Sequence, residues 1–256
     1  MGLGGFVLLA IASANLLSFS VGRHADRPEK LLTVLERDVV GCRACPRLVE
    51  WREHVAREKR AAYRDERYWG RPIPGFGDPR ARIVVLGLAP AAHGANRTGR
   101  VFTGERRGDW LFRAMHRAGL ANQPTSVSAD DGLALTDAWV TAAVKCAPPA
   151  NQPLPAERDA CAPFLTRELA ALATTRVVVC LGAFGYDAAC RHFDVRPRPK
   201  FGHGLEVDLT ELHGHGPVLL CSFHPSQQNT FTGRLTEPML DALFARAVEL
   251  ADEPVV

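Results

Sequence analysis

The chain has 256 residues, of which 46% are hydrophobic and 23% are charged. These values indicate a single globular domain with one sizeable core, and they exclude a chain dominated by low-complexity sequence. The net charge of +3 is unevenly spread, because residues 41–120 carry seventeen Lys and Arg against eight Asp and Glu. One face is therefore expected to attract phosphate, unless these arginines only decorate solvated helices.

The first segment is mostly apolar from Phe6 to Leu17 and becomes charged from Arg23 onward. It lacks the basic start of a secretory signal, and its apolar run is short for a membrane-spanning helix. We therefore interpret residues 1–38 as an apolar leader, either a disordered extension or the product of a mis-assigned start codon. Residues 39–252 are expected to form the folded domain.

Four cysteines have the arrangement of a metal or cluster site. Cys42 and Cys45 form a C-x2-C pair, while Cys146 and Cys161 follow about a hundred residues later. The other three cysteines, Cys180, Cys190 and Cys221, lie in apolar segments typical of a core. An odd total of seven favours reduced thiols over a disulfide framework. Zinc and a [4Fe–4S] cluster both fit four thiols, and the spacing does not choose between them.

Short apolar runs alternate with helical patterns along the rest of the chain. Strands are predicted at residues 82–88, 138–144, 176–181 and 217–222, and helices around 110–118, 157–173, 183–193 and 237–251. Such runs are typical of a sheet covered on both faces, so we expect a three-layer α/β/α sandwich around a mainly parallel, four-stranded sheet. Ligands of these folds bind beyond the carboxyl ends of the strands, where residues 89–104 and 223–234 form polar loops.

These two loops carry a resemblance to a known family. The stretches Gly87-Leu88-Ala89-Pro90-Ala91-Ala92-His93-Gly94-Ala95-Asn96-Arg97-Thr98-Gly99 and His224-Pro225-Ser226-Gln227-Gln228-Asn229 resemble the two signature motifs of family 5 uracil-DNA glycosylases, the iron–sulfur, broad-specificity branch. The four cysteines follow in the family's order, so the resemblance covers residues 40–250. It implies a uracil-glycosylase sandwich, a [4Fe–4S] cluster held by Cys42, Cys45, Cys146 and Cys161, and DNA containing deaminated bases as substrate.

Removal of a base requires that it first leave the duplex, which calls for a phosphate clamp, a wedge and a stacking platform. Phe102 is the expected platform, although core packing would also suit it. The candidate DNA contacts lie in the two motif loops and just after them: Arg97, Arg100, Gln227, Gln228, Asn229 and Arg234.

Cleavage of the glycosidic bond builds negative charge on the departing base, so a donor aimed at a base oxygen stabilises the transition state. His224 is the candidate donor, and His93 is a second candidate for base or phosphate contacts that could instead only pin its turn. Asn96 or Asn151 is expected to position the attacking water, although neither amide is a base. The products would be a free base and an abasic site, the first step of base excision repair.

Two departures from relatives point to a permissive base pocket. Ala89 occupies the position where many relatives carry an acidic or amide residue that activates water, and Ala142-Ala143-Val144 replaces the segment where family 4 has an asparagine that reads uracil. We therefore expect the chain to accept hypoxanthine as well as uracil.

Two other functions fit parts of the pattern. A damage-binding protein of the same fold, without turnover, is compatible with Ala89, and a zinc-stabilised enzyme acting on free nucleosides is compatible with the four thiols alone. No lysine is placed for a lyase step. We expect a monomer without membrane association, cytoplasmic and associated with the nucleoid.

Overall fold

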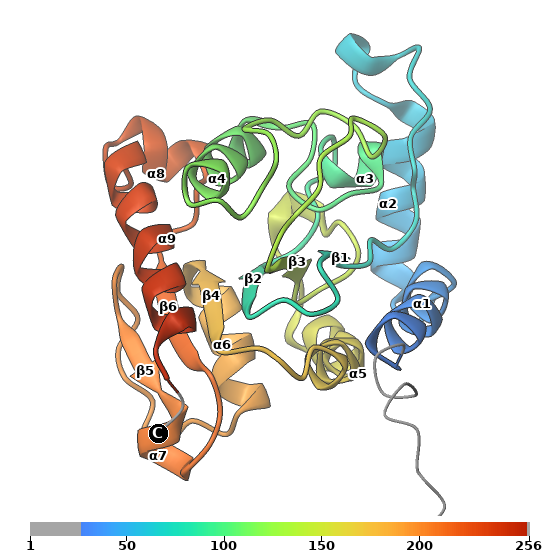
Figure 1. Ribbon diagram of the computed structural model, residues 1–256. Coiled ribbons are helices and arrows are strands. Elements are labelled where there is room, and N and C mark those ends of the chain that lie inside the picture. Colours follow the sequence, from blue (N-terminus) through green and yellow to red (C-terminus); the bar gives the residue numbers. More distant parts are fainter. Residues whose placement is uncertain (1–26, 255–256) are drawn as a thin grey trace, which may run out of the picture.

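The computed structural model describes residues 27–254, which form a sheet with helices on both faces (Figure 1). Six strands make one sheet in the order β1-β3-β2-β4-β6-β5. Their bounds are β1 Phe76–Gly77, β2 Ile83–Gly87, β3 Ala138–Ala142, β4 Val177–Leu181, β5 Glu206–Asp208 and β6 Val218–Ser222. Strands β3, β2, β4 and β6 run parallel, whereas β1 and β5 pair antiparallel at the two edges.

The expected three-layer α/β class is confirmed, and the expected strand count needs a correction. All four predicted strands occupy the centre of the sheet, but two edge strands of two and three residues widen it to six. The three residues of β5 alternate between polar and apolar, whereas the two residues of β1 are too few to show a period.

Helices follow the strands and bring the chain back across the sheet. The α-helices are α1 Arg27–Val40, α2 Pro46–Glu58, α3 Ala95–Thr98, α4 Arg106–Arg117, α5 Pro155–Ala171, α6 Gly182–His192, α7 Leu209–His213, α8 Gln227–Phe231 and α9 Glu237–Asp252, with short 3₁₀ turns η2 Ala61–Tyr63 and η3 Pro149–Asn151.

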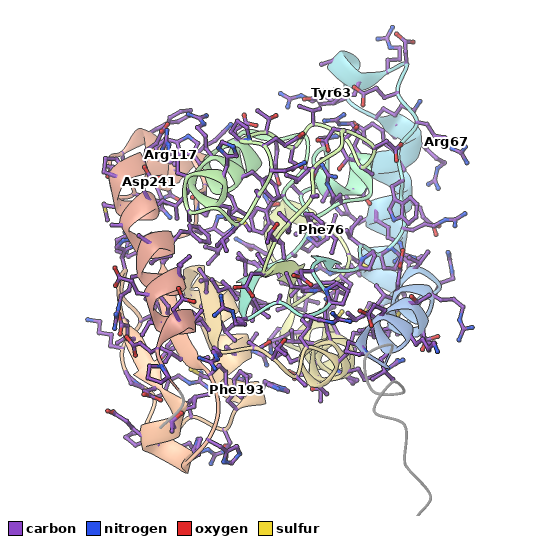
Figure 2. All side chains as sticks on the ribbon, in the orientation of Figure 1. Tyr63, Arg67, Phe76, Arg117, Phe193 and Asp241 are labelled. Carbon is purple, nitrogen blue, oxygen red and sulfur yellow. The ribbon has the colours of Figure 1, made fainter. Side chains whose placement is uncertain are left out.

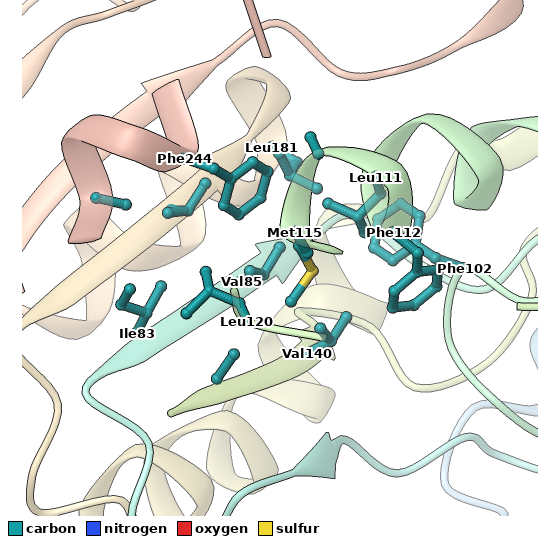
Figure 3. Close-up of a cluster of buried hydrophobic side chains, with 14 of the residues drawn as sticks. Ile83, Val85, Phe102, Leu111, Phe112, Met115, Leu120, Val140, Leu181 and Phe244 are labelled. Atoms are coloured by element: carbon teal, nitrogen blue, oxygen red, sulfur yellow. The ribbon is translucent and has the colours of Figure 1, made fainter. Parts of the chain in front are cut away.

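Alternate side chains of the strands build a separate core on each face. Ile83 and Val85 of β2 pack with Phe112 of α4 and Phe244 of α9, as Figure 3 shows. Val84 and Leu86 point the other way, into the core formed with α1, α5 and α6. Because neighbouring residues of a strand point to opposite faces, five apolar residues in succession require cover on both sides.

The expected boundary at residue 38 lies inside a helix. Leu32, Leu35 and Val39 of α1 are buried in the second core, where α1 packs against α5. Their spacing of three and four residues places them on one helix face, so residues 27–38 belong to the folded domain instead of the predicted extension. The rest of that predicted extension, residues 1–26, lies outside the described residues. Within the described part of the chain, no helix is both long and apolar enough to span a membrane.

Candidate active site

The two motif loops meet at the carboxyl edge of the parallel strands. The first follows β2 and the second follows β6, and the rings of Phe102 and His224 lie 5.9 Å apart between centroids, tilted by 34°. Phe102 is 6% exposed and His224 is half-buried. The structure therefore brings together the expected stacking platform and the expected donor, which are more than a hundred residues apart in the chain.

Two glycines make room for this pair. A Cβ at Gly87 would lie 2.7 Å from Cζ of Phe102, and one at Gly182 would lie 3.1 Å from Cβ of His224. Gly182, with φ +84°, also occupies the left-handed region that favours glycine. Both strand ends therefore need a residue without a side chain where the two rings approach.

The backbone around His224 is fixed by its own loop. Its carbonyl oxygen accepts hydrogen bonds from Nδ2 of Asn229 at 2.8 Å and from the backbone N–H of Ser226 at 2.7 Å. The Ser226 hydroxyl in turn caps α8 by accepting from the Asn229 N–H. Asn229, an expected DNA contact, thus has its side-chain nitrogen committed to shaping the loop.

Helix α8 presents the remaining polar side chains of the second motif outward. Gln227 and Gln228 are exposed, and Phe231 at its end is 70% exposed. A groove of about 290 Å³ between α4 and α8 is lined by Asp109, Trp110, Arg113, Pro225, Gln227, Thr230 and Phe231. The exposed Arg234 places its guanidinium 4.4 Å from the ring centroid of Phe223, the residue before His224.

Arg97 and Arg100 differ from the expectation that both clamp phosphate. They are only 9% and 8% exposed. Arg97 donates to the carbonyl oxygens of His93 and Gly104 and forms an ion pair with Glu66. Arg100 pairs with the buried Asp131 at 2.6 Å. Every nitrogen of both guanidinium groups therefore already donates to a protein acceptor.

The two candidate asparagines lie in different environments. Asn96 is fully buried, and its Nδ2 donates to the backbone oxygen of Arg52 at 3.1 Å, which ties the first motif to α2. Asn151 is exposed at the end of η3, beyond the carboxyl end of β3. Only Asn151 has a side chain that solvent reaches.

His93 pairs with a residue that the sequence did not single out. Its Nδ1 lies 3.0 Å from the hydroxyl of the buried Tyr68. Burial, together with the nearby charges of Arg60 and Arg97, lowers the pKa of His93 below the usual histidine value. The imidazole is therefore neutral at pH 7 and suited to hydrogen bonding, not to charge attraction.

Four cysteines from three parts of the chain line one pocket. Cys42 and Cys45 precede α2, Cys146 follows β3, and Cys161 lies in α5. Pro46 starts α2 directly after Cys45, because its ring already has a helical φ and its missing N–H is not needed there. Across the pocket, Nε of Arg47 donates to Glu157 of α5 at 2.8 Å. Helices α2 and α5, which flank the cysteines, are thereby held together.

The environment of these thiols combines burial with positive charge. Burial raises the pKa of Cys146 to about 12 and that of Cys161 to about 11. Nη1 of Arg52 lies 2.8 Å from the sulfur of Cys146, and the backbone N–H of Lys145 donates to the sulfur of Cys161 at 3.3 Å. Nε of Arg52 is buried without a hydrogen-bond partner. Among the described residues, no three His, Cys, Asp or Glu side chains are arranged around a single metal ion.

Arg52, only 2% exposed, is the main residue that the sequence interpretation missed. A signal for it was present, because Leu48, Arg52 and Val55 share one buried helix face at spacings of four and three residues. A charged residue on an apolar face requires a specific partner. Ala89, which was expected to border the base, packs partly against the apolar residues of the cysteine pocket.

Comparison with known proteins agrees with this arrangement. The model of the uracil DNA glycosylase superfamily matches residues 74–248. A type-5 uracil-DNA glycosylase of Mycobacterium bovis is 56% identical over 82% of this chain and 78% of its own length. The type-5 enzyme of Thermus thermophilus is 49% identical over 83% of this chain and 95% of its own length. A type-4 enzyme of Archaeoglobus fulgidus is 33% identical over 60% of this chain and 70% of its own length. The chain therefore belongs to the uracil-DNA glycosylase superfamily, in its type-5 branch, and is a DNA-repair glycosylase that hydrolyses N-glycosidic bonds.

Proposed function

We propose that this glycosylase removes uracil and other deaminated bases, hypoxanthine among them, from DNA and leaves an abasic site. The observation that carries the proposal is the approach of Phe102 and His224 at the carboxyl edge of the sheet, with ring centroids 5.9 Å apart. A flat aromatic ring beside a hydrogen-bonding imidazole is suited to hold a base and to bind one of its oxygens.

In this mechanism the base leaves the duplex and stacks on Phe102. His224 then donates a hydrogen bond to a base oxygen as negative charge develops there, and this contact is stronger in the transition state than in the ground state. Asn151 orients the water that attacks the sugar carbon, because it is the exposed one of the two asparagines. His93, held by Tyr68, makes an additional contact in its neutral form.

We relate the breadth of the substrate range to residues that follow β2 and β3. Ala142, Ala143 and Val144, where β3 ends and the chain continues, are buried and carry no polar side-chain atom. Ala89 supplies none either. Without a side-chain donor or acceptor at these positions, the chain lacks a polar contact there that would discriminate against a base whose edge differs from that of uracil.

The DNA contacts that we assign to the second motif are Gln227, Gln228 and Arg234. The two glutamines are exposed on α8, beside the exposed Phe231. From there their side chains can insert into the gap that the extruded base leaves in the duplex. Arg234 is exposed and stacked on Phe223, so its charge is close to the site, and no carboxylate of the described residues forms an ion pair with it.

We further propose that Cys42, Cys45, Cys146 and Cys161 hold a [4Fe–4S] cluster. All four line one pocket without gathering at a single-ion position, and a cluster of several iron atoms holds its thiolates farther apart than one zinc ion does. The buried guanidinium of Arg52 offsets the negative charge of such a group, and its unpartnered Nε is a spare donor. The cluster would supply structural anchoring, with no step of base removal assigned to it.

We also propose that the enzyme acts as a monomer and works where the chromosome is, in the cytoplasm at the nucleoid. A single chain contains both motif loops and all four cysteines, so the proposed site needs no second copy.

The test is strand cleavage by alkali of duplexes that contain uracil or hypoxanthine, for the unmodified protein, for His224→Ala and for His213→Ala. His213 is an exposed histidine at the end of α7 and serves as a matched control. Cleavage of both duplexes, reduced about a hundredfold or more only in His224→Ala, would support the proposal. Cleavage confined to uracil would contradict the broad range, and tight binding without cleavage would identify a damage-binding protein.

A further inference from the structure

The segment that follows α2 is an exposed arm. We define the basic arm as residues 57–71, which contain the end of α2, the turn η2 and the approach to the first motif. In Figure 1 it extends past the body at the upper right, above α2. Figure 2 labels Tyr63 near its tip and Arg67 pointing away from the molecule.

The charges of the basic arm are largely unpaired. It carries six Lys and Arg against three Asp and Glu. Four of its arginines are exposed with no carboxylate within ion-pair distance in the described part of the chain: Arg57, Arg60, Arg64 and Arg67. Surface arginines elsewhere commonly pair with carboxylates, as Arg82, Arg117 and Arg246 do. Of the acidic residues in the arm, Glu66 is engaged by Arg97, which leaves Glu58 and Asp65.

The basic arm is attached to the first motif at several points. The backbone N–H groups of Trp69 and Gly70 donate to the carbonyl oxygens of Arg97 and Asn96 at 2.9 Å and 3.1 Å. The guanidinium of Arg97 lies 4.0 Å from the ring centroid of Tyr63. The arm is therefore held in register with the loop that carries Phe102.

An exposed aromatic residue lies at the junction. Trp69 is 38% exposed, its ring lies beside Gly99, and its Nε1 donates to the backbone oxygen of Pro72 at 3.1 Å. The guanidinium of Arg71 lies 5.8 Å from its ring centroid. Cations interleaved with an aromatic ring on an exposed surface are suited to a nucleic-acid backbone.

We propose that the basic arm binds the phosphodiester backbone of the DNA beside the extruded nucleotide, on the opposite side of the site from α8. This inference rests on the proposed function. Figure 1 shows α8 and the arm at the two ends of the same upper edge of the molecule, so a duplex lying along this edge meets both. A guanidinium group without a carboxylate partner can bind two oxygens of one phosphate at the same time. This binding releases counterions from the DNA.

The cysteine pocket and the arm are connected through helix α2. Helix α2 begins beside Cys45, carries Arg52 into the pocket, and continues directly into the arm. Anchoring of α2 at the pocket therefore sets the position of the arm relative to the motif loops.

The experiment compares two triple variants with the same decrease in positive charge. The first is Arg60→Gln, Arg64→Gln and Arg67→Gln in the arm. The control is Arg37→Gln, Arg80→Gln and Arg196→Gln, whose side chains are 77%, 62% and 83% exposed elsewhere on the surface. Base removal from uracil-containing duplex is measured under single-turnover conditions over a range of DNA and salt concentrations.

The arm variant is expected to need roughly tenfold more DNA for half-saturation, with its saturating rate unchanged within about twofold. A plot of log affinity against log salt has a negative slope. Its magnitude should decrease by about 0.9 for each phosphate that the variant no longer neutralises. The control should change neither quantity. Equal effects in both triple variants, or a lowered saturating rate with an unchanged salt slope, would overturn the proposal.

A binding measurement separates this inference from the proposed function. Anisotropy of labelled duplex containing an abasic site reports affinity without turnover, so the arm is tested even if no base is removed. If the triple variant unfolds at a lower temperature than the control, the single variant Arg64→Gln replaces it in the binding measurement. The magnitude of its salt slope should decrease by about 0.9, the value for a single phosphate. An unchanged slope in that variant would also count against the arm.

Discussion

Nη1 of Arg52 lies 2.8 Å from the sulfur of Cys146, and the backbone oxygen of the same arginine accepts a hydrogen bond from Nδ2 of Asn96 at 3.1 Å. One residue of α2 thus contacts both the cysteine pocket and the first motif. Since Asn96 lies between His93 and Arg97, this contact links the proposed cluster to the loop that faces the base.

Substitution of this residue by an uncharged side chain of similar length should damage both regions. We expect Arg52→Met to lower the free energy of unfolding by about 2–4 kcal/mol, because buried acceptors lose their donor. It should also lower the iron content and the visible absorption. Arg52→Lys retains the charge and should recover part of both. Thermal unfolding and iron analysis check this, and full iron content in Arg52→Met would show that the guanidinium is not needed by the pocket.

Removal of one pocket cysteine should prevent binding of the proposed cluster. Cys146→Ala is expected to give colourless, poorly soluble protein, because an incomplete ligand set leaves α2 and α5 without their common anchor. Cys190→Ala, a buried thiol of α6 outside the pocket, is the control and should keep its colour. Normal colour and solubility of Cys146→Ala would mean that the ligands are assigned wrongly.

A methyl group at the end of β2 should disturb the stacking platform. In Gly87→Ala the new Cβ would approach Cζ of Phe102 to 2.7 Å, so the ring must move. We expect kcat/KM to fall by about tenfold or more, with a stability loss of about 1–3 kcal/mol from overpacking. Gly202→Ala is a suitable control, because nothing lies within 4 Å of its added Cβ. Unchanged kcat/KM in Gly87→Ala would contradict the assignment of Phe102.

Substitutions of Asn151 and Asn96, the two candidates for positioning the water, should affect different properties: the reaction rate and the stability. Asn151→Gly removes the exposed amide while tolerating the φ of +56° at this position, so the single-turnover rate should fall by about tenfold with little change in stability. Asn96→Ala removes the hydrogen bond from Nδ2 to the backbone oxygen of Arg52 at a fully buried position and should cost about 1–3 kcal/mol of stability. Rates at saturating DNA and denaturant unfolding distinguish these outcomes, and the reverse pattern would reassign the water-positioning role to Asn96.

Much of the architecture was predictable from local patterns. The four central strands are short, mostly apolar runs, and each was expected within two residues of its observed bounds. Edge strand β1 was missed because Phe76 and Gly77 alone contain no period. Helix α1 was assigned to a disordered extension because the apolar leader before it masked the spacing of Leu32, Leu35 and Val39.

By itself, the sequence determined the α/β class, the two motif loops and the four candidate cysteines, because periodicity and residue order are local properties. Tertiary structure decided which polar groups remain available for DNA. Arg100 meets Asp131 across 31 residues of chain, and Arg52 meets Cys146 across 94. The exposed arginines of the arm meet no carboxylate within the described residues. Burial and pairing depend on neighbours distant in sequence, and only the fold brings these neighbours together.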